Sequence, residues 1–195
     1  MTKGDDTRSA ILEAGMDVAA TDGLEALSIG RLADRVGMSK SGLFAHFHSK
    51  EELQLQVLQF ARDHFVAHVM LPAMGCPRGE PRIRALLENW LQWGSSPERV
   101  GGCVFLQAAA EYDDRPGLVR DLLVQTQRDW HTALARAAGL AVSEGHFRTG
   151  LDEQQFAFEM YALIMAHHFH LRLLEDPSTP NRTRTAFERL LQSCR

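Results

Sequence analysis

Residues 27–53, LSIGRLADRVGMSKSGLFAHFHSKEEL, contain three predicted helix starts, and the first two helices flank Gly37. Ser28 opens the first helix, because a serine hydroxyl accepts a hydrogen bond from an otherwise unpaired backbone N–H, and apolar residues follow at helical spacing. Gly37 ends that helix, since glycine adopts the left-handed conformation without a Cβ penalty. Ser39 and Ser49 cap two further helices. This stretch therefore restricts the chain to short helices joined by tight turns.

The two short helices on either side of Gly37 have the form of a helix-turn-helix. The second helix of that motif lies in the major groove of DNA, and here it is predicted to run from Ser39 to Phe47. Its buried side is expected to consist of Leu43, Phe44 and Phe47. The outward residues are small or hydrogen-bonding, which allows contact with phosphates and base edges: Ser39, Lys40, Ser41, Ala45 and His46. Each of these residues alone is ordinary at a surface, so the interpretation depends on the combined pattern.

The segment GMSKSGLFAHFHSKEEL resembles the signature of the TetR family of bacterial transcriptional regulators, whose usual form is close to G-V-S-K-x-x-L-Y-x-H-F-x-S-K-E-E-L. The resemblance covers residues 7–55. It implies an all-α fold with an N-terminal three-helix DNA-binding head and a C-terminal helical core that dimerises and binds a ligand. The positions that match DNA-contact positions of the family are Ser28, Ser39, Lys40, Ser41, Phe44, His46 and Lys50.

Two residues depart from the family pattern inside the predicted recognition helix. Phe44 stands where tyrosine is common, and it lacks the hydroxyl that bonds a phosphate. Gly42 replaces a commoner Thr or Ala and weakens the helix by roughly 0.5–1 kcal/mol relative to Ala. Binding to DNA is therefore expected to depend more strongly on Lys40, Lys50 and backbone N–H groups.

Charge alone does not point to DNA. The chain of 195 residues has a formal net charge of −4, and residues 1–50 carry six Lys and Arg against seven Asp and Glu. A general polyanion binder is excluded, whereas a specific binder needs only a local positive stripe. We expect a cytoplasmic protein without membrane association, because no long uncharged run or apolar leader is present and the three cysteines have no disulfide or zinc spacing.

Helical periodicity continues to the end of the chain, without strand-like alternation. We predict a DNA-binding domain over residues 1–50 and a ligand-binding and dimerisation domain over 51–195. The expected helices run over residues 7–22, from 49 until Pro72 interrupts, from Pro81 to 93, and over 103–112, 116–139, 151–175 and from 179 onward. A loop is expected between Pro72 and Pro81.

The helix over residues 151–175 is apolar on two sides. One stripe contains Phe156, Met160, Leu163, Ile164 and Leu171, and the other contains Tyr161, Met165, Phe169 and Leu173. A helix of this kind buries one face in its own core and has a second face for another subunit. The resemblance likewise implies a homodimer formed through the last two helices.

Aromatic and histidine residues of the C-terminal region are candidates for lining a ligand pocket, since such pockets combine aromatic walls with a few polar groups. The candidates are Trp90, Trp93, Phe105, Trp130, His131, Tyr161, His167 and His168, with Phe169 as a further aromatic residue. Ordinary core packing explains each of them equally well. A small apolar or aromatic effector fits a pocket of this composition.

The nine histidines leave a second interpretation open, a metal sensor or a helical metal-dependent enzyme. His64 and His68 share one helix face, but no H-E-x-x-H motif, nucleophile elbow, P-loop or dinucleotide fingerprint is present. We therefore expect no enzyme, no catalytic residue, no metal and no cofactor. The favoured hypothesis is a homodimeric repressor that binds a palindromic double-stranded DNA operator and responds to a small molecule. A pure interaction scaffold is the third alternative.

Overall fold

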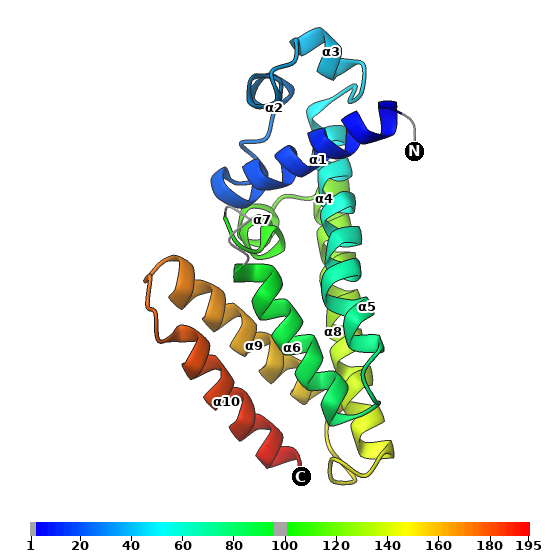
Figure 1. The fold of residues 1–195 in the computed structure, drawn as a ribbon, viewed down its shortest axis with the longest axis vertical. Coiled ribbons are helices and arrows are strands. Elements are labelled where there is room, and N and C mark those ends of the chain that lie inside the picture. The colour runs from blue at the N-terminus through cyan, green and yellow to red at the C-terminus, as the bar shows by residue number, and fades with distance from the viewer. Residues whose placement is uncertain (1–2, 96–100) are drawn as a thin grey trace. The chain divides into compact units, whose positions relative to one another are not determined.

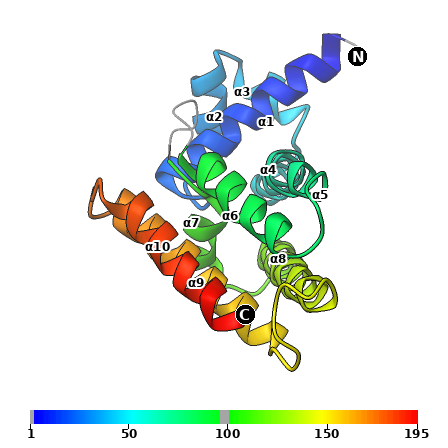
Figure 2. The ribbon, with the colours of Figure 1, turned by 60° about the horizontal axis from the view of Figure 1, so that its bottom comes forward.

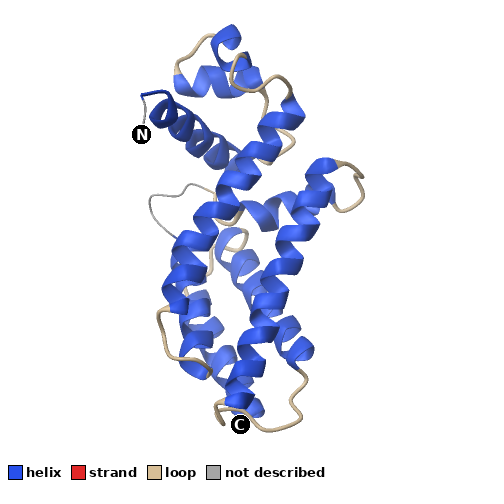
Figure 3. Ribbon diagram, turned by 90° about the vertical axis from the view of Figure 1, so that its right-hand side faces the viewer, coloured by secondary structure: helices blue, strands red, loops and turns tan. Residues whose placement is uncertain are grey.

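The computed structural model describes residues 3–95 and 101–195, and every regular element in these two ranges is a helix (Figure 3). The chain forms two compact units, each built from separate segments. Unit 1 contains residues 1–65 and 96–126, and unit 2 contains residues 66–95 and 127–195. The predicted all-α fold is confirmed. Among the described residues, no helix combines the length and apolarity needed to cross a membrane.

Unit 1 carries the N-terminal helices. It contains α1 (Lys3–Asp22), α2 (Ile29–Val36), α3 (Lys40–Phe44), α4 (Lys50–Phe65), α7 (Val104–Tyr112) and the beginning of α8 (Leu118–Ser143). Helix α1 crosses the first turns of α4 (Figure 1) and also contacts α2 and α7. Gly15 allows the crossing with α4, because a Cβ at that position would lie 2.7 Å from a methyl carbon of Val57. The side chains that fill the interior of this unit include Leu24, Leu27, Leu32, Leu43, Phe47, Leu53 and Leu58.

Unit 2 consists of the later helices. It contains a π-helical turn η1 (Val66–Met70), α5 (Leu71–Met74), α6 (Glu80–Ser95), the remainder of α8, α9 (Glu153–Arg172) and α10 (Thr179–Cys194). Helices α9 and α10 pack side by side (Figure 2). The buried face of α9 supplies Phe156, Met160 and Ile164. These three residues belong to the first of the two predicted stripes.

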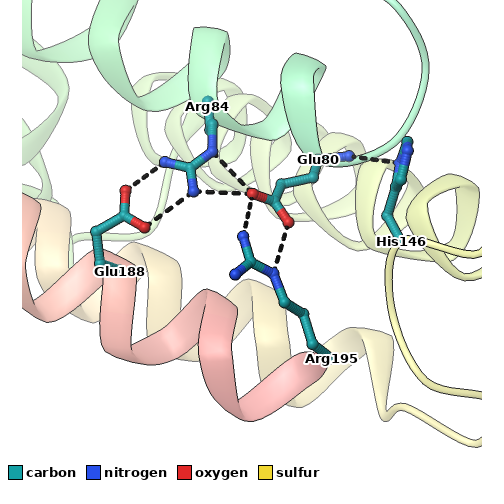
Figure 4. A network of polar contacts seen from close by, with 5 residues as sticks. All are labelled: Glu80, Arg84, His146, Glu188 and Arg195. Carbon is teal, nitrogen blue, oxygen red and sulfur yellow. Dashed lines mark hydrogen bonds and ion pairs between the residues drawn. The ribbon is translucent and has the colours of Figure 1, made fainter.

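Ion pairs join α6 to α10 at the surface of unit 2 (Figure 4). The Arg84 guanidinium contacts the carboxylates of Glu80 and Glu188, and Arg195 donates to Glu80 at 2.6 Å. These arginines hold the pKa of Glu80 below its ordinary value, with the Arg195 hydrogen bond as the largest cause. Exposed and half-exposed ion pairs of this kind add little to stability, about 0–1 kcal/mol each.

Several predicted helix boundaries are wrong, for local reasons. The helix expected to stop at Pro72 continues, because η1 ends just before it and Pro72 lies in the first turn of α5, where a missing N–H costs nothing. Helix α8 continues past Gly139 to Ser143. A Cβ at Gly139 would lie 2.5 Å from a carboxylate oxygen of Glu153, which is the far end of a side chain that can move aside.

Candidate nucleic-acid interface

The first helix of the motif begins and ends as its sequence predicts. Ser28 has extended backbone geometry, and its hydroxyl accepts from the N–H of Arg31 at 3.3 Å. Gly37 adopts a left-handed conformation with φ of +68°, and its N–H donates to the carbonyl of Ala33. Ala33 is fully buried. The cap and the glycine turn thereby set the direction in which the chain enters α3.

Helix α3 is shorter than predicted. It spans only Lys40–Phe44 rather than Ser39 to Phe47, although Ser39 caps it by accepting from the N–H of Gly42 at 3.0 Å. The N–H groups of both His46 and Phe47 converge on the carbonyl of Leu43, so the chain closes in a turn after Phe44. Leu43 and Phe47 are fully buried beneath this turn. Phe44 is 52% exposed, so its assignment to the buried side was wrong.

The other predicted DNA-contact residues in and around α3 are exposed or half-buried. Ser39, Lys40 and Ser41 are exposed, and the hydroxyls of Ser39 and Ser41 lie 3.2 Å apart. The aliphatic stem of Lys40 lies over Gly30, where an added Cβ would come within 3.3 Å of Lys40 Cε. Ser28 and His46 are half-buried, and the His46 ring lies 6.2 Å from that of Phe47. Ser39, Lys40 and Ser41 thus lie at the start of α3, whereas Ser28 caps α2 and His46 follows the end of α3.

Lys50 has a partner within the protein. Its Nζ lies 2.6 Å from Oε1 of Glu25, which belongs to the loop between α1 and α2. The sequence motif gave no indication of this pair, because the two residues are 25 positions apart. Lys50 is the first residue of α4, which Ser49 caps by accepting from the N–H of Glu52 at 3.0 Å.

The side chain of Glu111, in α7, binds the backbone of the loop between α1 and α2. Its two carboxylate oxygens accept from the N–H groups of Leu24 at 3.0 Å and Glu25 at 2.7 Å. The side chain of Gln54, buried in α4, donates to the carbonyl of Leu24 at 2.8 Å. Sequence reasoning missed these three contacts. The one available signal was a charged residue, Glu111, placed at the end of the otherwise apolar segment of residues 103–112.

Arg8 connects α1 to α4 across the same unit. Its guanidinium donates to the side-chain oxygen of Gln56 and lies 5.2 Å from the centre of the Phe47 ring. The arginine therefore has one partner on α4 and one in the turn after α3. Its contribution is to hold the fully buried Phe47, and with it the turn after α3, against the first helix.

The predicted ligand-binding residues are divided between the two units. Phe105 belongs to unit 1, where its ring lies 6.2 Å from that of Phe65. In unit 2, Trp90 meets His167 edge to face at 5.8 Å, and His131 lies 4.4 Å from the ring of Tyr161. Trp93 and Trp130 are buried, whereas His168 is half-buried and Phe169 is 51% exposed on α9. Phe169 therefore does not line an interior wall of its unit.

His167 is the most unusual polar residue of unit 2. It is 3% exposed, and its Nδ1 lies 2.9 Å from the hydroxyl of Thr183. Its Nε2 has no hydrogen-bond partner among the residues that the structure describes. Burial, followed by the nearby charges of His168 and Arg184, lowers the pKa of His167 to about 4. The imidazole is therefore neutral at physiological pH and has one ring nitrogen available for a further polar atom.

The histidines do not assemble a metal centre within residues 3–95 and 101–195. No group of three or more His, Cys, Asp or Glu side chains is placed there to hold an ion. His64 lies against the Phe60 ring, with centroids 4.3 Å apart, and His146 accepts from the backbone N–H of Glu80 at 3.3 Å. His64 thus contacts an aromatic ring of its own helix, and His146 accepts from the first residue of α6.

Two segments of the chain match models of known protein families. Residues 11–57 match the family model described as "Bacterial regulatory proteins, tetR family", and residues 79–187 match the model described as "Tetracyclin repressor-like, C-terminal domain". A curated relative is the HTH-type transcriptional activator FasR of Mycolicibacterium smegmatis, which is 37% identical over 89 residues. That match covers 46% of this chain but only 41% of FasR.

Solved structures share the fold over nearly the whole chain. A TetR transcriptional regulator from Chloroflexus aurantiacus superposes with a TM-score of 0.86 at 23% identity, covering 98% of this chain and 96% of that one. AibR, solved in complex with isovaleryl coenzyme A and operator DNA, superposes with a TM-score of 0.68 at 21% identity, covering 82% and 84% of the two chains.

Proposed function

Because the chain belongs to the TetR family of bacterial transcriptional regulators, we propose that it binds a palindromic operator as a homodimer and releases it when a small effector enters the helical core. The observation that carries this proposal is the accessible N-terminus of α3, where Ser39, Lys40 and Ser41 are exposed beyond the left-handed turn at Gly37. We assign the DNA-binding role to residues 1–50 and the effector and dimer roles to residues 51–195. No catalytic role is assigned.

Direct contact with DNA is assigned to the residues that remain accessible. Ser41 and His46 are proposed to contact base edges, Ser28, Ser39, Lys40 and Lys50 to contact phosphates, and Phe44 to make apolar contact with a thymine methyl or a sugar. The exposure of Phe44 supports the last assignment, because an aromatic ring in water gains from such a contact.

Dimerisation is assigned to the exposed apolar stripe of α9, with α10 packed beside it. The stripe consists of Phe158, Met165, Phe169 and Leu173, which are between 51% and 67% exposed and recur at helical spacing. An exposed stripe of large apolar residues favours association with a complementary surface. A second copy supplies the same stripe across a two-fold axis, which is the commonest symmetry of homo-oligomers.

An effector site is assigned near Trp90 and His167 in unit 2. A buried polar atom without a partner costs about 1–3 kcal/mol, and a polar atom of a ligand removes that cost at His167 Nε2. The effector proposed here is small and mostly apolar or aromatic, with one hydrogen-bonding group. AibR has been solved with a thioester-linked acyl chain, isovaleryl coenzyme A, although the likeness to AibR supports the fold alone.

We further propose that the regulator acts as a repressor, by occupying promoter DNA. FasR is named an activator, so the direction of control needs its own test. Genomic fragments retained by the purified protein identify the operator and its neighbouring gene. Deletion of the regulator then raises transcription of that gene if the protein represses it, and lowers transcription if it activates. Failure to retain any duplex at low ionic strength would overturn the proposed function.

A further inference from the structure

The pair formed by Lys50 and Glu25 lies at the surface of unit 1. Their atoms are 2.6 Å apart, and their side chains are 42% and 49% exposed. Lys50 is one of the two lysines assigned to operator phosphates above. A carboxylate oxygen and a phosphate oxygen make the same kind of charge-assisted hydrogen bond to an ammonium group. Glu25 therefore occupies, within the protein, the partner position that a phosphate would need.

Other residues hold Glu25 in this position. The hydroxyl of Tyr112 donates to Oε2 of Glu25 at 3.0 Å, and Arg115 lies 3.4 Å from the same oxygen. The pKa of Glu25 is lowered by the hydrogen bond from Lys50, and further by the hydrogen bond from Tyr112 and the charge of Arg115. The carboxylate is therefore charged at neutral pH. Because Glu111 fixes the backbone of the same residue, the carboxylate is presented to Lys50 by α7 rather than by a loose loop.

Lys50 is not confined in the same way. A hollow of about 270 Å³ lies beside the pair, lined by Glu51, Gln54, Tyr112, Arg115 and Val119 among others. A half-exposed lysine next to open space can turn away without repacking the interior. The geometry thus combines a fixed carboxylate with a lysine that is free to exchange partners.

We propose that Glu25 is a positioning residue that sets operator affinity by competing with a DNA phosphate for Lys50. The proposal rests on the proposed function, since it needs a protein that binds DNA. In the free protein Glu25 neutralises Lys50, so the lysine contributes less than a full charge to phosphate binding. Glu25 therefore weakens the sequence-independent part of the affinity, for the operator and for other DNA alike.

The test compares Glu25→Gln with the wild-type protein on an operator duplex over a range of salt concentrations. Glutamine keeps the size and the hydrogen-bond acceptor but removes the charge. We expect affinity at low salt to rise about two- to fivefold, in keeping with the strength of an exposed ion pair, and the log–log salt slope to steepen by up to about one unit. Random-sequence DNA should show the same gain, because phosphates carry no sequence information.

Three controls separate competition for Lys50 from a general effect of charge. Glu51→Gln removes a carboxylate beside the same hollow that makes no bond to Lys50, and it should change the slope less. In a Lys50→Met background, Glu25→Gln should have no more effect than Glu51→Gln. Glu25→Asp restores the charge and should return the slope toward the wild-type value. Should Glu25→Gln fail to fold, Glu25→Ala is the replacement variant and carries the same expectation.

The outcomes distinguish this inference from the proposed function. A wild-type protein that binds no operator contradicts the proposed function itself. A wild-type protein that binds its operator, with Glu25→Gln and Glu51→Gln indistinguishable in affinity and slope, overturns the role of Glu25 alone. Equal gains from Glu25→Gln with and without Lys50 would overturn it as well.

Discussion

The hydroxyl of Ser39 accepts the backbone N–H of Gly42 at 3.0 Å and lies 3.2 Å from the hydroxyl of Ser41. One serine side chain thus caps the recognition helix and contacts the next serine that faces outward. This arrangement links local helix stability to the presentation of Ser41. In a helix of only five residues with a glycine at its centre, the cap is a large part of what keeps the backbone helical.

Replacing Ser39 with alanine should lower the free energy of unfolding by about 1 kcal/mol, the usual value of an N-cap. Operator affinity should fall as well, because the α3 backbone loses its fixed geometry. Urea denaturation and a binding titration measure the two effects. Ser39→Asn is the matched control, since asparagine also caps, and it should preserve stability. Unchanged stability in Ser39→Ala would show that the cap contributes nothing.

Lys40 should act through phosphate charge. We expect Lys40→Ala to weaken binding to operator and random DNA alike, and to make the log–log salt slope shallower by about one unit. Arg189→Ala removes an equally exposed cation from α10 in unit 2 and serves as the control. Equal slopes for the two variants would remove Lys40 from the interface.

The apolar stripe on α9 should control assembly. Phe169→Glu places a charge in the proposed dimer interface, so we expect the sedimentation profile to shift from dimer to monomer. Leu118→Glu is the control, because Leu118 is also a large exposed apolar residue, 59% exposed, but lies in α8 outside the stripe. Retention of the dimer by Phe169→Glu would place the interface elsewhere.

His167 should make stability depend on pH in the weakly acidic range. Its folded-state pKa is lowered to about 4 from an unfolded value near 6.5, so protons bind the unfolded chain first as pH falls. The stability present above pH 6.5 is therefore lost toward pH 4, by on the order of 1–2 kcal/mol at pH 5. His167→Asn removes this dependence, and denaturation at pH 7.5 and 5 measures it. If the wild-type protein loses no more stability between pH 7.5 and pH 5 than His167→Asn does, His167 is not the cause of the pH dependence.

Short-range patterns predicted the local structure well. The caps at Ser28, Ser39 and Ser49 were readable because each depends on residues three positions apart. The two-sided apolarity of α9 also predicted the burial of Phe156, Met160 and Ile164 and the exposure of Met165, Phe169 and Leu173. It did not predict the half-burial of Tyr161 or the exposure of Phe158.

Contacts between residues far apart in the chain could not be predicted from the sequence. Neither the Glu25–Lys50 pair nor the capping of Leu24 and Glu25 by Glu111 follows from spacing, because the partners are brought together by packing. Aromatic composition likewise predicted burial of Trp90 and Trp130 but not the separation of Phe105 into the other unit. The assignment of individual DNA-contact and effector-contact residues stays a prediction.

Footprinting of the wild-type protein on a duplex selected from genomic DNA tests the central claim most directly. Two symmetric protected half-sites are expected, with centres about one helical turn, ~34–36 Å, apart, on one face of the duplex. Lys40→Ala should lose both half-sites together. A single asymmetric protected site, or no protection at any salt concentration, would contradict the account.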